Sequence, residues 1–196
     1  MKIGFDLDNT IICYDSSFAK CGIDLGYFPS NFTGSKAEVK RELISRVNGH
    51  NQWEKLQGLV YGKHIGYAEI FPGFMDLLDV LKRDQNVEIK IISHKTIYAH
   101  QDSSKTELRK SAKNFLKRHK IISGDYLSCE QIIFCSTLDE KIEQIVSQNC
   151  EIFVDDLCKV FNHRNFPKDC RKILFRENSS VIESYANWSS IQRVLI

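Results

Sequence analysis

The chain has 196 residues, of which 42% are apolar and 27% are charged. A chain of this length and composition can bury a sizeable core, which excludes the disordered and low-complexity classes and fits one domain with a small insertion. The 27 Lys and Arg residues against 25 Asp and Glu residues leave a net charge of +2. That balance does not favour nucleic acid or an anionic membrane as a partner.

The first residues and the cysteines indicate a cytoplasmic protein. Asp6 stands where a signal peptide needs an apolar segment, and no run approaches the ~18 apolar residues of a membrane span. The seven cysteines are an odd number without a C-x-x-C pair, and apolar stretches such as Ile132–Cys135 surround most of them. We therefore expect a cytoplasmic protein with free thiols rather than a disulfide framework.

Short apolar runs rich in Ile, Val and Phe alternate with segments of helical period. Strands are predicted at Ile3–Leu7, Val87–Ile92, Gln131–Cys135, Glu151–Val154 and Lys172–Phe175. Helices are predicted at Phe74–Arg83, Thr106–Lys117 and Leu138–Ser147. This alternation is typical of an α/β fold in which helices cover both faces of a parallel sheet.

Residues 13–70 separate the first predicted strand from the next helix and indicate a small, mostly helical insertion. The capping box Ser35–Glu38 predicts the start of one helix, which Asn48-Gly49 ends. A second helix is predicted at Gln52–Tyr61. The chain returns at the turn Phe71-Pro72-Gly73. We therefore divide the chain into an α/β core of residues 1–12 and 71–196 and a helical insertion of residues 13–70.

Pairs of acidic residues stand at the ends of two predicted strands. Asp6 and Asp8 lie in the stretch Asp6-Leu7-Asp8-Asn9-Thr10 at the end of the first strand, and Asp155 and Asp156 follow Glu151–Val154. Because the carboxyl ends of parallel strands meet at one edge of a sheet, we expect the four carboxylates to converge. Carboxylates at such short distances from one another repel, unless a hard cation such as Mg²⁺ neutralises their charge.

Two further segments are predicted to reach the same edge. Ser93, His94 and Lys95 follow the strand Val87–Ile92. Lys141, near the start of the helix Leu138–Ser147, can direct its ammonium to this edge, where helix N-termini favour anions. Taken singly, Ser93 is more often a capping hydroxyl and Lys141 a solvated lysine, but their order along the strand ends favours a site.

Together these residues resemble the four motifs of the haloacid dehalogenase-like (HAD) superfamily. In chain order, the residues that carry the resemblance are Asp6, Asp8, Thr10, Ser93, Lys141, Asp155 and Asp156. The resemblance covers residues 1–160 and implies a Rossmann-like core, a small helical C1-type cap and a HAD-type phosphoric monoester hydrolase with Mg²⁺. The third motif departs from the family pattern, because Lys141 lies only 14 residues before Asp155 and Lys120 is an alternative.

The resemblance also implies a role for each motif residue. Asp6 is the nucleophile that forms an aspartyl phosphate, and Asp8 is the acid and base. The implied metal ligands are Asp6, Asp8 through its main-chain carbonyl, Asp155 and Asp156, with the direct ligand among the last two left open. The implied phosphate-binding residues are Thr10, Ser93 and Lys141. His94 and Lys95 are candidates for contact with the substrate, although a solvated pair at a strand end explains them equally well.

The predicted function is a Mg²⁺-dependent phosphatase that acts on a small phosphorylated metabolite. A sugar phosphate is the first candidate substrate. Residues 154–175 are similar to HAD-type hydrolases associated with bacterial surface-carbohydrate genes. Three alternatives stay open: a phosphomutase, a nucleotide or nucleic-acid end phosphatase, and a non-catalytic HAD-like binding protein.

Overall fold

The computed structural model describes residues 1–99, 105–122, 126–176 and 178–196. Its contacts divide the chain into two compact units, each of which is described by itself. The first, which we call the sheet unit, comprises Met1–Ile12, Ile70–Lys95 and His119–Ile196. The second, the helical unit, comprises Cys13–Glu69 and Thr96–Arg118.

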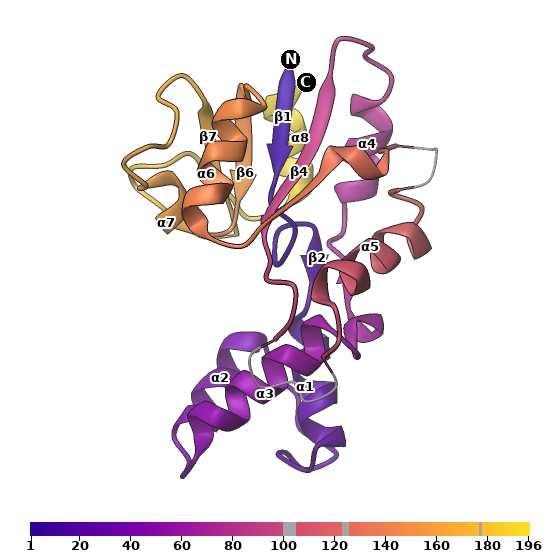
Figure 1. The fold of residues 1–196 in the computed structure, drawn as a ribbon, viewed down its shortest axis with the longest axis vertical. Helices are drawn as coiled ribbons and strands as arrows, with labels where there is room; N and C mark the ends of the chain where they lie inside the picture. The colour runs from indigo at the N-terminus through magenta and orange to yellow at the C-terminus, as the bar shows by residue number, and fades with distance from the viewer. Residues whose placement is uncertain (100–104, 123–125, 177) are drawn as a thin grey trace. The chain divides into compact units, whose positions relative to one another are not determined.

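A six-stranded parallel sheet forms the centre of the sheet unit (Figure 1). Its strands are β1 (Lys2–Phe5), β4 (Glu88–His94), β5 (Ile132–Cys135), β6 (Ile152–Asp155), β7 (Arg171–Phe175) and β8 (Ser184–Tyr185). They lie in the order β5-β4-β1-β6-β7-β8, and neighbouring strands are parallel. Phe5 at the end of β1 is opposite Ile91 of β4 on one side and Val154 of β6 on the other, so β1 lies between these two strands. The predicted parallel sheet is confirmed, with one further strand, β8.

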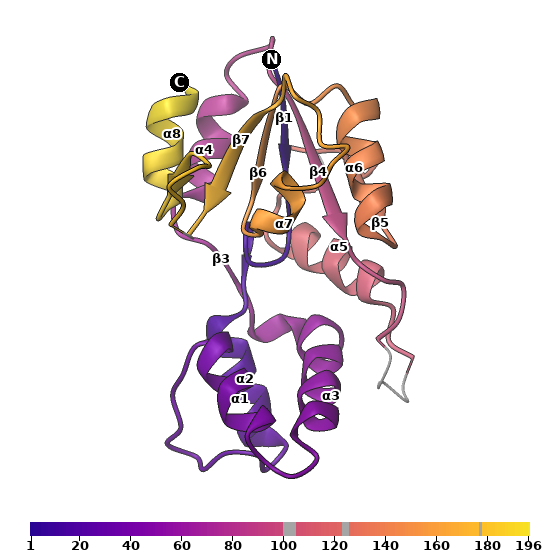
Figure 2. The same cartoon turned by 90° about the vertical axis from the view of Figure 1, so that its left-hand side faces the viewer.

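Helices cover both faces of this sheet (Figure 2). They are α4 (Phe74–Leu81), α6 (Leu138–Ser147), α7 (Cys158–Phe161), α8 (Trp188–Leu195) and the 3-10 turn η2 (Cys129–Gln131). On one face, the Phe5 ring meets Phe74 of α4 and Trp188 of α8 edge to face, at 5.7 and 5.6 Å between ring centroids. On the other face, Ile142 of α6 joins Phe153 of β6 in one apolar cluster.

The helical unit contains the predicted insertion. Its helices are α1 (Asp15–Asp24), α2 (Lys36–Ile44), α3 (Gly49–Tyr61), the 3-10 turn η1 (Ile65–Tyr67) and α5 (Leu108–Arg118). The predicted capping box opens α2: the Ser35 N–H donates to Glu38 Oε2 at 2.7 Å, and Ser35 Oγ accepts from the Glu38 N–H at 3.3 Å. The Phe18 ring of α1 stacks on Trp53 of α3 at 5.0 Å. No helix within the described ranges has both the length and the apolar character that a membrane span requires.

The contacts group α5 with the helical unit, whereas the sequence analysis assigned its residues to the core. The reason is local packing: the side chains of Thr106 and Leu108 lie against Gly62, just after α3. The chain passes between the two units at the short paired strands β2 (Ile12–Cys13) and β3 (Glu69–Ile70), and again on either side of the segment Thr96–Arg118.

Gly4 in β1 offers a test of the sheet packing. A Cβ atom at this position would lie 2.5 Å from the ring of Phe153, which is fully buried. We expect Gly4→Ala to lower the free energy of unfolding by about 1–3 kcal/mol, measured by urea denaturation. Phe153→Leu makes room, so the double variant should lose less stability than the sum of the two single variants. Strict additivity would contradict this packing.

Candidate active site

A tight loop directly after β1 carries the first acidic pair. The Leu7 carbonyl accepts hydrogen bonds from the backbone N–H groups of Ile11 and Ile12, both at 2.9 Å. Asn9 donates its N–H to the Ile12 carbonyl at 2.9 Å and has a φ of 63°. Asn tolerates this left-handed conformation better than most residues, because its short side chain can bond locally. The loop therefore holds the backbone of Asp6–Thr10 in one conformation.

Asp6 and Asp155 share one buried lysine. Lys141 Nζ lies 2.5 Å from Asp6 Oδ1 and 2.6 Å from Asp155 Oδ2, and only 2% of its side chain is exposed. Lys141 belongs to the first turn of α6, whose N-cap residue Thr137 accepts a hydrogen bond from the Glu140 N–H. Of the two lysines that the sequence offers for the third motif, Lys141 is thus the one that meets both carboxylates.

Burial and charge crowding change the pKa values of this pair in a way that favours an additional cation. Burial raises the pKa of Asp6 to about 7; Lys141 opposes the rise, and the Asp155 and Asp8 carboxylates add to it. Burial alone would lower the pKa of Lys141, but the carboxylates of Asp155 and Asp6 raise it above its ordinary value. Lys141 therefore stays charged, while the charge on Asp6 is costly without a further cation.

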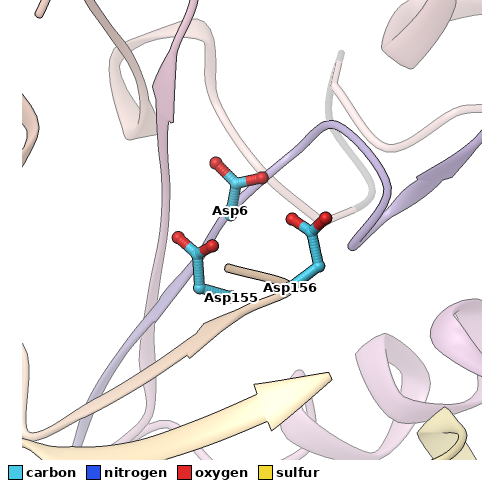
Figure 3. Close-up of side chains that lie close together, drawn as sticks. All are labelled: Asp6, Asp155 and Asp156. Carbon is cyan, nitrogen blue, oxygen red and sulfur yellow. The ribbon is translucent and has the colours of Figure 1, made fainter. Parts of the chain in front are cut away.

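Figure 3 shows three carboxylates that converge, and Lys141 contacts two of them. Asp6, Asp155 and Asp156 each offer one oxygen, and these oxygens lie within 4.8 Å of one another. The Leu157 N–H donates to Asp155 Oδ1 at 2.9 Å, and Thr10 Oγ1 donates to Asp156 Oδ1 at 3.3 Å. These bonds orient the carboxylates. Because hard divalent cations take carboxylate oxygens as ligands, the cluster fits such an ion.

The second member of the acidic pair, Asp8, contacts a different lysine. Lys95 Nζ lies 2.6 Å from Asp8 Oδ2, and the two side chains are 2% and 18% exposed, respectively. Lys95 is a candidate substrate contact in the sequence, where its ion pair with Asp8 is not predicted. The signal was present, because Ser93 and Lys95 are two residues apart and alternation along a strand places both on one face.

The other predicted residues of this strand end lie in two different surroundings. Ser93 is buried, with 1% of its surface exposed. His94 is exposed, and its Nε2 lies 3.0 Å from the Ser136 carbonyl oxygen. Strand alternation places His94 on the face opposite Ser93. In the described parts of the chain, Lys95 thus contacts an acidic residue of the site directly, whereas His94 contacts the Ser136 carbonyl.

A residue far along the chain supports the loop after β1. Trp188 of α8 is fully buried, and its Nε1 donates to the Thr10 carbonyl at 3.1 Å. Its ring contacts Phe5 and stacks on Phe175 at 4.8 Å. The sequence analysis missed Trp188, because 178 residues separate it from Thr10 and no local pattern reports that contact.

Comparison with known proteins identifies the fold. No protein-family model matches the chain, and no curated protein matches it. A HAD-superfamily hydrolase from Ehrlichia chaffeensis is 18% identical with a TM-score of 0.52, covering 99% of this chain and 95% of that one. A HAD-superfamily hydrolase of subfamily IA, variant 1, from Geobacter sulfurreducens is 11% identical with a TM-score of 0.57, and the match covers 100% of this chain and 96% of that one. A predicted phosphoglycolate phosphatase from Haemophilus somnus is 13% identical with a TM-score of 0.50, and the match covers 99% of this chain and 97% of that one.

These structures share one fold with this chain over nearly its full length. The chain therefore has the fold of HAD-superfamily hydrolases, as the order of its motifs predicted. Identities this low show the fold alone.

The raised pKa of Asp6 predicts that this carboxylate destabilises the metal-free protein. A carboxyl whose pKa rises on folding from 3.8 to about 7 costs stability progressively as the pH rises through that interval. Asp6→Asn cannot ionise, so in EDTA it should be more stable than wild type by about 1–4 kcal/mol at pH 8, with the difference shrinking toward pH 4. Urea denaturation at pH 4, 6 and 8 measures this. A variant less stable than wild type at pH 8 would contradict the prediction.

Proposed function

We propose that this chain is a Mg²⁺-dependent phosphatase that hydrolyses a small phosphorylated metabolite through an aspartyl-phosphate intermediate. The observation that carries the proposal is the convergence of Asp6, Asp155 and Asp156 beside the buried Lys141 at the ends of β1 and β6. The shared fold with HAD-superfamily hydrolases, among them a predicted phosphoglycolate phosphatase, supports it.

The charges of the site match one divalent cation. When the carboxyls of Asp6, Asp8, Asp155 and Asp156 are all ionised, the ammoniums of Lys95 and Lys141 leave two negative charges uncompensated. We propose that Asp6, Asp155 and Asp156 hold the ion through their side chains and Asp8 through its main-chain carbonyl. When bound, Mg²⁺ neutralises these carboxylates and withdraws charge from the phosphoryl oxygens.

Each of this chain's own groups has a defined task in the proposed reaction. Asp6 attacks phosphorus in line, and the buried Lys141 at 2.5 Å orients its carboxylate. Asp8 gives a proton to the leaving oxygen and then takes one from the attacking water. The hydroxyls of Thr10 and Ser93, together with Lys141, bind the phosphoryl oxygens.

The selection of the substrate is proposed from the sequence. We assign this selection to the helical insertion, residues 13–70, as a small C1-type cap of the core of residues 1–12 and 71–196. The insertion is attached next to the site loop, because the Phe71 N–H donates to the Ile11 carbonyl at 2.9 Å. A sugar phosphate is the first candidate substrate, with neither a membrane nor nucleic acid as partner.

Substitution of the nucleophile tests the function. Wild type should hydrolyse p-nitrophenyl phosphate and at least one of a panel of phosphorylated sugars with Mg²⁺, and EDTA should abolish the activity. Asp6→Asn should lose activity by about 10³-fold or more, because an amide cannot form the acyl phosphate. A variant that keeps a tenth of the wild-type rate would exclude the covalent mechanism.

The metal ligands are tested by Asp155→Asn and Asp156→Asn. Each should raise the Mg²⁺ concentration for half-maximal activity by about tenfold or more, with the larger effect at the direct ligand. Each should also reduce the stabilisation that Mg²⁺ gives in thermal unfolding, a readout independent of turnover. Asp139→Asn is the matched control, because this side chain is 75% exposed and pairs with His163. Unchanged Mg²⁺ dependence in both site variants would exclude them as ligands.

A further inference from the structure

One buried cation of the site, the Lys95 ammonium, has no task in the proposed reaction. Lys95 Nζ lies 2.6 Å from Asp8 Oδ2, and 98% of the lysine side chain is shielded from solvent, since only 2% is exposed. Burying an ammonium to this extent is costly, and a close carboxylate partner offsets the cost. The partner in this case is the residue proposed as acid and base, so the ion pair bears on proton transfer.

Both partners extend from fixed backbone. The Lys95 N–H donates to the Cys135 carbonyl at 2.9 Å, which continues the pairing of β4 with β5 beyond its last paired residue, His94. Asp8 lies within the loop that Leu7 and Asn9 close with backbone hydrogen bonds. Because neither backbone can shift easily, the ion pair fixes the orientation of the Asp8 side chain.

Charge compensation alone does not explain the position of Lys95. Lys141 already contacts both Asp6 and Asp155, so these carboxylates have their own cation. Lys95 instead contacts one oxygen of Asp8 at hydrogen-bond distance. A general acid must be held within hydrogen-bond reach of the leaving oxygen, and such geometry is lost when its side chain can rotate.

We propose that Lys95 is a positioning residue that holds the Asp8 carboxyl, through Oδ2, so that Oδ1 transfers the proton. The inference rests on the proposed phosphatase function. In the first step, the Asp6 carboxylate forms a bond to phosphorus, the bond to the leaving oxygen breaks, and the Asp8 proton goes to that oxygen. In the second step, water bonds to phosphorus, its proton returns to Asp8, and the bond from phosphorus to Asp6 breaks.

The test compares Lys95→Met with wild type on two phosphate esters. The p-nitrophenolate group departs without a proton, whereas the alkoxide of glycerol phosphate needs one. Because kcat/KM reports the steps up to departure of the leaving group, Lys95→Met should lower it by about 30-fold or more for glycerol phosphate and by less than about threefold for p-nitrophenyl phosphate. The kcat values should fall for both esters, because both share the attack of water on the phospho-Asp6.

Three further variants separate positioning from general damage. In an Asp8→Asn background, Lys95→Met should add less than about a threefold loss, because Lys95 acts through Asp8. Lys95→Arg keeps the charge and should recover part of the activity on glycerol phosphate. Lys90→Met is the matched control: Lys90 lies on β4, the strand that Lys95 follows, and pairs with Glu88 at 2.9 Å, so this variant should leave both activities unchanged.

The outcomes distinguish this inference from the function on which it rests. An equal loss of kcat/KM on both esters in Lys95→Met, with wild type active and Asp6→Asn inactive, would overturn the role of Lys95 alone. If Lys95→Met lowered the activity as much in the Asp8→Asn background as in wild type, that result would also overturn the role of Lys95 alone. A wild type without phosphatase activity, or an active Asp6→Asn, would overturn the proposed function and the role of Lys95 with it.

Discussion

Four carboxylates gathered around two buried ammoniums are the constraint on which the rest of this structure depends. They meet because β1 and β6 are adjacent and parallel, so the residues that follow Phe5 and Val154 emerge at the same edge of the sheet. Burial raises the pKa of Asp6, and the nearby Asp155 and Asp8 carboxylates add to that rise. A packed interior holds them together only because Lys141 and Lys95 each approach a carboxylate closely, and the remaining negative charge makes the site receptive to a divalent cation.

The geometry of the site is maintained from the opposite side of the sheet. Trp188 packs in the aromatic cluster under β1 and holds the Thr10 carbonyl, while Thr10 in turn donates to Asp156. The loop between Asp6 and Ile12 is thus fixed by its own backbone bonds and by a helix at the far end of the chain. A rigid support of this kind suits phosphoryl transfer, in which catalysis depends mainly on positioning and electrostatics.

Much of this arrangement could be predicted from the sequence, since buried strands such as β6 are apolar runs and the capping box of α2 is a local pattern. The motif carboxylates could be placed because each lies at or shortly after the end of such a strand. α8 was missed although Asn187 caps it and its apolar residues recur at helical spacing from Trp188 to Leu195. The grouping of α5 with the helical unit and the hydrogen bond from Trp188 to Thr10 could not be predicted, because sequence periodicity reports only which face is buried and not its partner.

The position of β1 in the sheet has a consequence for synthesis of the protein. Lys2 pairs with Glu88 and Ile3 with Ile152, so β1 is translated well before the two strands with which it pairs. The helical unit, whose last helix ends at Arg118, has all of its residues available before β6 is translated. Because non-local strand pairing is slow and domains form as units during translation, the helices can fold while the apolar β1 is still unpaired. The nucleophile Asp6, which directly follows β1, therefore becomes functional only after β6 has been translated.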